Sequence, residues 1–514
     1  MNGAEALIRT AAGAGVEICF ANPGTTEMHL VAALDAAPGI RPVLALFEGV
    51  VTGAADGYAR MAGKPALTLL HLGPGFANGI ANLHNARRAS SPIVNVIGDH
   101  ATWHLAADAP LTSDIESLAR PVSRWVRKTA TAAELAGDTA DAVAAARAGA
   151  GGVATLIVPA DCAWGEAPGP VAAKRIEPRA AVAGATVDAI ARSLRGGKPA
   201  LILLGGDSLS RRGQLAAARV AAKSGARVLL GTFPPRVERG AGLPPLAKFP
   251  YFPEQGVELL EKVGELVLAG AVEPVAFFGY PKIPSRLAPE GCHISVLAKP
   301  DEDASAALEA LAEALGAKPD EGIRATREAF PEANGKLNSE TLGRTLARLQ
   351  PEGAIVVDEA ATSGAQWFSL AAGAAPHTVL SLTGGAIGQG LPNAVGAAIA
   401  CPDRRVIAFQ ADGSSMYTLQ SLWTMARENL DVTVVVCANR QYRILKVELA
   451  RADITQPGPA ARSLTDLTPP ELDFVSLARG FGVPGESVKT AEQLAAALGR
   501  SFAARGPRLV EALL

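Results

Sequence analysis

The sequence is poor in aromatic residues and has no long apolar run. Phe, Trp and Tyr make up 5% of its 514 residues, although 49% of the residues are hydrophobic. No stretch of about 18 or more apolar residues occurs, which excludes a membrane-spanning helix. The N-terminus reads as the start of a helix and lacks the basic segment and apolar core of a secretory signal. The hydrophobic content therefore predicts large buried sheets in a protein that has no membrane partner.

The sequence also has few cysteines and a small net charge. The five cysteines are scattered, and their spacing shows neither a metal motif nor a disulfide framework. We therefore expect buried, reduced thiols and a cytoplasmic location. The net charge is −2, which argues against a nucleic-acid partner or a membrane surface.

The length and the alternation of patterns predict the domain organisation. A chain of this size should form about three domains of ~150 residues each. Short apolar runs alternate with helical patterns throughout, which indicates βα units and parallel sheets. We expect an α/β fold of three doubly wound parallel-sheet domains, at 1–165, 185–317 and 338–514. A loop rich in Pro, Gly and Ala, at 165–184, is the expected first linker.

Strands are predicted where apolar runs are short and bounded by turn residues. The runs are Val16–Ala21, Ala66–Leu72, Pro92–Ile97, Ala154–Val158, Ala200–Leu204, Ala226–Leu230, Pro274–Phe278, His293–Leu297, Ala354–Asp358, Thr378–Leu382, Val406–Gln410, Val432–Cys437 and Arg508–Leu513. Met416, Tyr417 and Trp423 have helical spacing and are expected in the core of a helix.

Two polar residues follow two of these strands. Asp412 comes after one apolar run, and Asn439 follows another a little over two dozen residues later. Two parallel strands that deliver oxygen ligands to one sheet edge make a site for Mg²⁺ or Ca²⁺. The amides of Gly413 and Ser414, where the next helix starts, could hold an anion. The pattern favours a metal-held diphosphate; the alternative is an Asp that caps a helix and an unrelated Asn.

A carboxylate stands at the start of a helix rich in small residues. Glu48 lies between the apolar run Val43–Phe47 and the segment that ends in Ala-Asp-Gly-Tyr-Ala-Arg60. Burial there would raise its pKa and suit a group that exchanges a proton with a ring nitrogen. The alternative is a Glu that only benefits from the helix dipole.

These segments resemble the motifs of thiamine-diphosphate-dependent enzymes. The segment that contains Asp412 and Asn439 is similar to that family's Gly-Asp-Gly-Ser motif followed by Asn-Asn. Ala411 and Ala438 replace a Gly and an Asn of that motif. The segment that contains Glu48 resembles the catalytic-glutamate helix of acetolactate synthase, benzoylformate decarboxylase and pyruvate oxidase. The resemblance implies that Glu48 bonds the pyrimidine ring of the cofactor. It also implies that the carbonyl of Gln441 joins Asp412 and Asn439 as a metal ligand.

Further motifs extend the resemblance over the whole chain. They are Phe20–Glu27, Gly73–Asn78, Asp358–Ser363 and Gly384–Pro392. By this resemblance, Thr362 contacts a phosphate, Gly385 offers its carbonyl to the cofactor amine, and Ile387 lies under the bent middle of the cofactor. Tyr442 would contact the phosphates or lie over the substrate. The alternative for the glycine-rich run 384–392 is a plain helix-entry loop.

One histidine stands out by its place after a strand. His71 precedes a Gly-Pro-Gly loop and matches an active-site histidine of benzoylformate decarboxylase, where it moves protons. Thr25 matches a substrate-contacting Ser of that relative. The alternative is a His that only lines a cleft wall. The second active-site histidine of that relative has no counterpart in Phe278–Arg286, which weakens the benzoylformate interpretation.

The function implied by the resemblance is decarboxylation or carboligation of 2-oxo acids, with thiamine diphosphate and Mg²⁺ (or Ca²⁺) as cofactors. The expected type is an acetolactate synthase large subunit. The alternatives are a non-ligating 2-oxo acid decarboxylase and a catalytically quiet homologue that binds the cofactor. The resemblance also implies a homodimer or homotetramer with sites shared between subunits. Binding of FAD is not expected, because Gly205–Ser208 lacks a full Gly-x-Gly-x-x-Gly motif.

Overall fold

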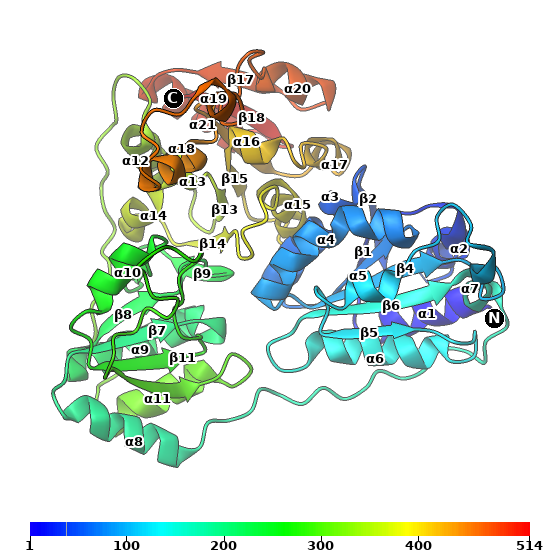
Figure 1. Cartoon of the computed structure of the whole chain (residues 1–514), viewed down its shortest axis with the longest axis horizontal. Helices are drawn as coiled ribbons and strands as arrows, with labels where there is room; N and C mark the ends of the chain where they lie inside the picture. Colours follow the sequence, from blue (N-terminus) through cyan, green and yellow to red (C-terminus); the bar gives the residue numbers. More distant parts are fainter. Residues whose placement is uncertain (38) are drawn as a thin grey trace. The chain divides into compact units, whose positions relative to one another are not determined.

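The computed structural model describes residues 1–37 and 39–514, in two compact units (Figure 1). The first unit comprises Met1–Ile176, Pro331–Trp367 and Leu382–Leu514. The second comprises Glu177–Phe330 and Phe368–Ser381. The first unit therefore contains both ends of the chain, and the second is built mainly from its middle.

The N-terminal part of the first unit is a parallel sheet with helices on both faces. Its strand order is β2-β1-β3-β4-β6-β5. The strands are β1 (Ile18–Asn22), β2 (Arg41–Leu44), β3 (Ala66–Leu70), β4 (Ile93–Asp99), β5 (Trp125–Lys128) and β6 (Val153–Pro159). The helices are α1 (Gly3–Gly13), α2 (Met28–Ala36), α3 (Glu48–Ala62), α4 (Leu72–Ala89), α5 (Ile115–Ala119), α6 (Leu135–Arg147) and α7 (Ala160–Trp164).

The central strands of this sheet are buried because both faces are covered. Helices α1, α2 and α6 pack on one face, and α3 and α4 lie on the other (Figure 1). Strands β3, β4 and β6 are buried along their whole length, as expected for parallel strands between two helix layers. The carboxyl ends of β1 and β3 lead into the turns that carry Thr25 and His71.

The C-terminal part of the first unit is a second parallel sheet, with the strand order β17-β18-β16-β15-β13. Its strands are β13 (Ile355–Glu359), β15 (Val406–Ala411), β16 (Val432–Ala438), β17 (Gly485–Val488) and β18 (Arg508–Leu513). Its helices are α12 (Ser339–Leu349), α13 (Ala361–Gly364), α15 (Gly390–Ala400), α16 (Asp412–Ser415), α17 (Ser421–Arg427), α18 (Arg443–Arg451), α19 (Pro459–Ser463), α20 (Phe474–Gly480) and α21 (Ala491–Ala503).

Helices α3 and α15 join the two sheets of the first unit at very close range. A methyl group on Gly57 would lie 2.2 Å from the carbonyl oxygen of Asn393, and one on Gly396 would lie 1.9 Å from that of Ala54. Only glycine leaves room for backbones at this distance. The small residues of both helices thus explain how the two parts pack without a gap.

A buried ion pair lies at this crossing. Asp56 accepts hydrogen bonds from Nε and Nη2 of Arg60, at 2.8 and 2.6 Å, and both side chains are at most 2% exposed. From the C-terminal part, Nε2 of Gln389 donates to Asp56 at 2.6 Å, and Arg60 donates to Oγ1 of Thr383 at 2.9 Å. The pair therefore ties α3 to the loop that precedes α15.

The second unit contains a further parallel sheet and an antiparallel pair of strands. Its parallel order is β10-β8-β7-β11-β12, and β9 pairs antiparallel with β14. The strands are β7 (Ala200–Leu204), β8 (Arg227–Leu230), β9 (Arg236–Arg239), β10 (Ala247–Lys248), β11 (Glu265–Ala269), β12 (His293–Ala298) and β14 (His377–Ser381). The helices are α8 (Gly184–Arg195), α9 (Arg211–Ser224), α10 (Pro253–Leu260) and α11 (Ala304–Ala314). The predicted α/β fold with parallel sheets is confirmed.

The strand predicted at Pro274–Phe278 is wrong. The strand between β7 and β12 is β11, whose five residues are all buried. The segment 274–278 instead forms an isolated bridge at Val275, and Val275 and Phe278 are more than half exposed. Within this segment, the ring of Phe277 packs edge-on against Phe233 and at a tilt against Tyr251, so the apolar residues of the segment belong to a surface cluster.

Two further observations concern the cysteines and the possibility of membrane-spanning helices. Each cysteine is a free thiol in the structure, but only Cys19, Cys162 and Cys437 are buried; Cys292 and Cys401 are partly exposed. Among residues 1–37 and 39–514, no helix is both long and apolar enough to cross a membrane.

Removal of one partner from the Asp56–Arg60 pair should strongly destabilise the first unit. We expect Arg60→Leu to cost about 3–5 kcal/mol, because the carboxylate of Asp56 would stay buried without its cation. Urea unfolding followed by circular dichroism measures the loss. The control is Arg120→Ala, which breaks an exposed ion pair with Glu116 and should cost less than about 1 kcal/mol. Equal losses in the two variants would contradict the prediction.

Candidate functional site

The parallel register of β15 and β16 brings Asp412 and Asn439 to one sheet edge. Ala411 pairs with Cys437, so the residues that follow both strands emerge together. Asp412 is 1% exposed, and its carboxylate accepts hydrogen bonds from the amides of Gly413 at 2.9 Å and Arg440 at 2.6 Å. Burial raises the pKa of this carboxyl group, and the two amides oppose that rise. The amides also fix the direction of the carboxylate.

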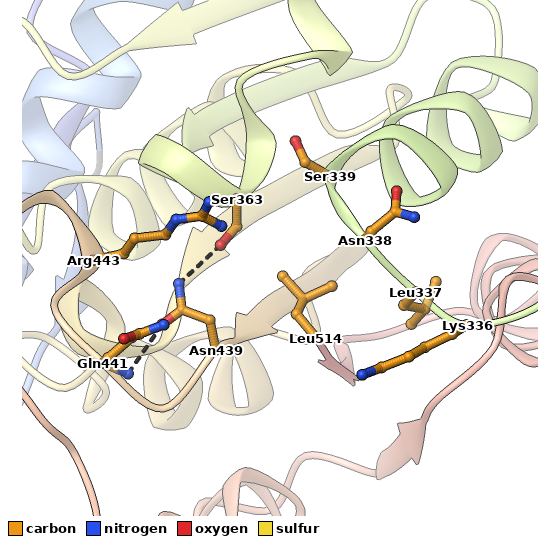
Figure 2. Close-up of a pocket in the computed structure, with 9 residues that line it drawn as sticks. All are labelled: Lys336, Leu337, Asn338, Ser339, Ser363, Asn439, Gln441, Arg443 and Leu514. Carbon is orange, nitrogen blue, oxygen red and sulfur yellow. Dashed lines mark hydrogen bonds between the residues drawn. The ribbon is translucent and has the colours of Figure 1, made fainter. Parts of the chain in front are cut away.

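Asn439 links this edge to helix α13. Its Nδ2 donates to Oγ of Ser363 at 3.0 Å, and its Oδ1 accepts from the amide of Gln441 at 3.0 Å (Figure 2). Asn439, Gln441 and Ser363 are therefore neighbours, although Ser363 follows a different strand. Thr362, the predicted phosphate contact, is the partly buried residue before Ser363.

A cavity of about 330 Å³ adjoins these residues (Figure 2). Ser363, Asn439 and Gln441 line it, together with Lys336, Leu337, Asn338, Ser339, Arg443 and Leu514. Most of these side chains are polar, and Lys336 and Arg443 are cationic. The cavity suits an anionic group.

We call Asp412, Asn439 and Gln441, together with the amides of Gly413 and Ser414, the clamp. Tyr442 lies on the clamp, and Tyr417 is its neighbour. A methyl group on Gly413 would lie 2.4 Å from the ring of Tyr442, so the ring covers Gly413. Burial raises the pKa of Tyr442, and the neighbouring Tyr417 side chain adds to this rise. The expectation that Met416 and Tyr417 are helix core is wrong. Helix α16 ends at Ser415, and the two side chains are 38% and 53% exposed.

The clamp offers oxygen ligands. Within the part of the chain that the structure describes, no three His, Cys, Asp or Glu side chains gather as a metal site. Asp412 supplies a carboxylate, Asn439 an amide oxygen and Gln441 a backbone carbonyl. Such a donor set suits Mg²⁺ or Ca²⁺ and not a softer metal. The residues present therefore fit the predicted ion.

The loop before α15 is held from several sides. Asn85 of α4 accepts from the amides of Gly384 and Ala386 and donates to the carbonyl of Ala386 at 2.8 Å. Nε2 of His84 lies 3.1 Å from the carbonyl oxygen of Gly384. Between these anchors Gly385 is exposed, with a φ of +77°, a conformation that suits glycine. Ile387 is partly buried.

Glu359 holds the other end of this loop. Its carboxylate accepts from the amides of Gly388, Gln389 and Gly390, at 2.7, 3.3 and 2.7 Å. The side chain lies at the end of β13 and is almost completely buried. Burial raises the pKa of Glu359 to about 7, and the three amides oppose this rise. Its role could not be read from the motif Asp358–Ser363 alone.

Glu48 lies at the first position of α3 and is largely buried. Its Oε2 accepts from Nδ2 of Asn78 at 3.0 Å. A methyl group on Gly75 would lie 3.2 Å from Oε1 of Glu48 and 3.3 Å from Cβ of His71. Gly75, in the first turn of α4, therefore lies between Glu48 and His71. The two predicted catalytic residues are close neighbours in the structure.

His71 is paired with a carboxylate that sequence reasoning missed. Its Nδ1 lies 2.8 Å from Oε2 of Glu27, which is fully buried and also accepts from the amide of Gly24 and the hydroxyl of Thr26. If Nδ1 carries the proton toward the carboxylate, Nε2 faces outward as the reactive nitrogen. Thr25, the predicted substrate contact, begins the same turn and is exposed.

Two glycines make room for this pair. A methyl group on Gly24 would lie 2.3 Å from the ring of His71, and one on Gly98 would lie 1.8 Å from Oε1 of Glu27. Glu27 is the last residue of the motif Phe20–Glu27, but a single sequence does not show that its side chain points toward the end of β3. The contact with His71 becomes visible only when β1 and β3 pair in the sheet.

Comparison with known proteins assigns the family. The model of the thiamine pyrophosphate enzyme N-terminal TPP binding domain matches residues 1–118, and that of the C-terminal TPP binding domain matches residues 361–512. A Mycobacterium tuberculosis protein named "Putative acetolactate synthase large subunit IlvX" is 51% identical over 515 residues, which cover 100% of this chain and 99% of that protein. The chain belongs to the thiamine pyrophosphate enzyme family.

Other thiamine pyrophosphate enzymes are more distant relatives. Benzoylformate decarboxylase of Pseudomonas aeruginosa is 28% identical, and the match covers 97% of this chain and 96% of that one. The solved structure of a Rhodococcus jostii thiamine diphosphate-dependent 4-hydroxybenzoylformate decarboxylase has a TM-score of 0.86 and 26% identity, over 99% of this chain and 98% of that one. The resemblance predicted from the motifs is confirmed. The protein is a thiamine-diphosphate-dependent enzyme of the acetolactate synthase and benzoylformate decarboxylase type.

Loss of the Glu27 carboxylate should impair turnover more than cofactor binding. In Glu27→Gln the side chain can no longer accept hydrogen bonds at both ends, so His71 loses its orientation. We expect the turnover of a 2-oxo acid to fall roughly 10–100-fold, while the Kd of thiamine diphosphate changes less than about twofold, because Glu27 lies away from the clamp. Steady-state kinetics and cofactor titration measure the two effects.

The control for this variant is Glu17→Gln. Glu17 forms an exposed ion pair with Lys64, and its substitution should change neither quantity. Wild-type turnover by Glu27→Gln would refute a role of this pair in the reaction.

Proposed function

We propose that the protein catalyses Mg²⁺-dependent decarboxylation and carboligation of 2-oxo acids, as an acetolactate synthase large subunit does. The 51% identical relative of that name, which matches over the whole chain, is the observation that carries this proposal. The geometry supports it, because Asp412 and Asn439 follow paired strands at one sheet edge and the first turn of α4 lies between Glu48 and His71.

The clamp would hold the diphosphate end of the cofactor. Asp412, Asn439 and the carbonyl of Gln441 would bind the metal ion, in keeping with their oxygen donors. The amide of Ser414, at the N-terminus of α16, and the hydroxyl of Thr362 would hold phosphate oxygens, and the Gly413 amide would join them on release from the Asp412 carboxylate. The Ser414 hydroxyl donates to the carbonyl of Ala411, which leaves its amide for this task.

The remaining residues would orient the cofactor and handle protons. When bound, thiamine diphosphate supplies the electron sink for loss of CO₂ from a 2-oxo acid. Glu48 would share a proton with the pyrimidine ring nitrogen through Oε1, since Asn78 occupies Oε2. Gly385 would accept the cofactor amine at its carbonyl, and Ile387 would support the bent middle of the cofactor. His71 would move a proton at Nε2, and Thr25 would contact the substrate.

A simple 2-oxo acid decarboxylase of the benzoylformate type is the second candidate. The pair formed by His71 and Glu27 favours it, because a positioned imidazole suits protonation of the product. The segment Phe278–Arg286 contains no histidine, which weighs against it. A catalytically quiet homologue is motivated by Ala411 and Ala438, but Glu48, Asp412 and Asn439 are all retained.

A substrate panel separates these candidates. The purified protein is incubated with pyruvate, 2-oxobutyrate, benzoylformate, phenylpyruvate or oxalyl-CoA, with thiamine diphosphate and Mg²⁺. We expect release of CO₂ and a 2-hydroxyketone product, and loss of activity after removal of the metal with a chelator. An aldehyde as the sole product would favour the decarboxylase. Bound cofactor without turnover of any substrate would favour the quiet homologue.

We further propose a homodimer or homotetramer with active sites shared between subunits, as the family motifs imply. Glu48 forms its side-chain hydrogen bond with the N-terminal part, and the clamp lies in the C-terminal part. If two subunits share each site, inactive variants Glu48→Gln and Asp412→Ala should partly restore activity when mixed. Subunit exchange followed by activity assay tests this; exchange without any regained activity would contradict it.

We also propose that the enzyme works without FAD. The amides of Ala304 and Ser305, where α11 begins, donate to the carboxylate of Asp207, at 3.1 Å each. Asp207 belongs to the loop Gly205–Ser208, the one candidate nucleotide loop of the sequence. Its carboxylate therefore takes the position in which a nucleotide phosphate would need these amides.

A further inference from the structure

Glu359 is a buried carboxylate whose partners are all backbone amides of one loop. It ends β13, and its two oxygens accept from Gly388, Gln389 and Gly390. Asp358, the neighbouring carboxylate, disfavours its ionisation further. A buried acid is costly to keep, but a neutral amide of similar size would leave part of these three amides without an acceptor. This cost suggests that the carboxylate has a role beyond filling space.

The loop is anchored on both sides of Ile387. Before it, the amide and the carbonyl of Ala386 are both bonded to Asn85. After it, the amide of Gly388 donates to Glu359, and its carbonyl accepts from Oγ1 of Thr418 at 2.9 Å. The backbone position of Ile387 is therefore set by Asn85 on one side and by Glu359 on the other.

An ordinary helix cap does not account for this arrangement. Caps are normally supplied by the residue at the N-cap position, here Gln389, whose side chain forms no such bond in the structure. The carboxylate instead comes from the end of β13, the strand that leads directly into Thr362 and Ser363. Glu359 thus connects the diphosphate side of the site to the loop that carries Gly385 and Ile387.

We propose that Glu359 is a positioning residue that sets the loop 385–387 at the distance from the clamp that the bent cofactor requires. It acts through the amides of 388–390 and does not itself touch the cofactor. This inference rests on the proposed function in that it assumes that Gly385 and Ile387 contact the cofactor. It predicts that Glu359 affects binding of the whole cofactor but not of its diphosphate end.

The test compares two ligands in Glu359→Gln and wild type. Gln has a similar size, but its NH₂ group faces an amide that also donates, so one end of the loop is released. We expect the Kd of thiamine diphosphate, measured with Mg²⁺ by calorimetry, to rise at least about tenfold. The Kd of inorganic diphosphate with Mg²⁺ should change less than about twofold. Amide hydrogen exchange at 386–390 in the cofactor-free protein should become faster.

The control is Glu265→Gln in the second unit. Glu265 is 1% exposed and is hydrogen-bonded by Ser193, His293 and Ser295, so it matches the burial of Glu359 without a link to the loop. This variant should bind both ligands as wild type does. It shows how much of any change comes from the loss of a buried carboxylate as such.

The outcomes separate this inference from the proposed function. Equal affinities of wild type and Glu359→Gln for thiamine diphosphate overturn the inference and leave the function in place. Equal weakening of both ligands also overturns it, because that points to general damage of the sheet edge. If wild type does not bind thiamine diphosphate at all, the proposed function and the inference both fail.

Discussion

The buried pair of Asp56 and Arg60 connects the two cofactor-binding parts of the chain. It lies about two to three turns after Glu48 on α3. Its outer hydrogen bonds reach Thr383 and Gln389, which flank the loop of Ile387. Because both ions are almost completely buried, their geometry tolerates little change. Glu48 and the loop are therefore held in a common frame, and the close crossing of α3 and α15 keeps that frame rigid.

Four carboxylates of the candidate functional residues have different hydrogen-bond partners. The Asp412 carboxylate is oriented by two backbone amides, that of Glu359 accepts from three amides of the loop, and that of Glu27 contacts His71. Glu48 is left with one oxygen bonded to Asn78 and the other toward the first turn of α4. Each acid thus has its own environment, which is how several carboxylates of one chain can serve different tasks.

Local sequence patterns were enough to predict much of the fold and the site, because many candidate residues directly follow strands that short apolar runs reveal. The alternation of short apolar runs with helices was enough for parallel sheets, and Arg508–Leu513 is predicted and observed with the same bounds. The pattern failed at Pro274–Phe278, where apolar side chains form a surface cluster, and at Tyr417, where a helix ends early. In both cases the side chains are apolar or aromatic, but their burial depends on neighbours far along the chain.

The sequence by itself determined the family and the α/β class and predicted the clamp residues, because each of these depends on residue types at short spacing. Only the tertiary structure decided which side chains support them. Glu27 contacts His71, and Asn85 forms hydrogen bonds with the loop before α15. Glu359 accepts hydrogen bonds from three backbone amides that lie some thirty residues further along the chain. These contacts join separate elements, and their geometry arises only when the strands and helices pack. Spacing along the chain cannot show it.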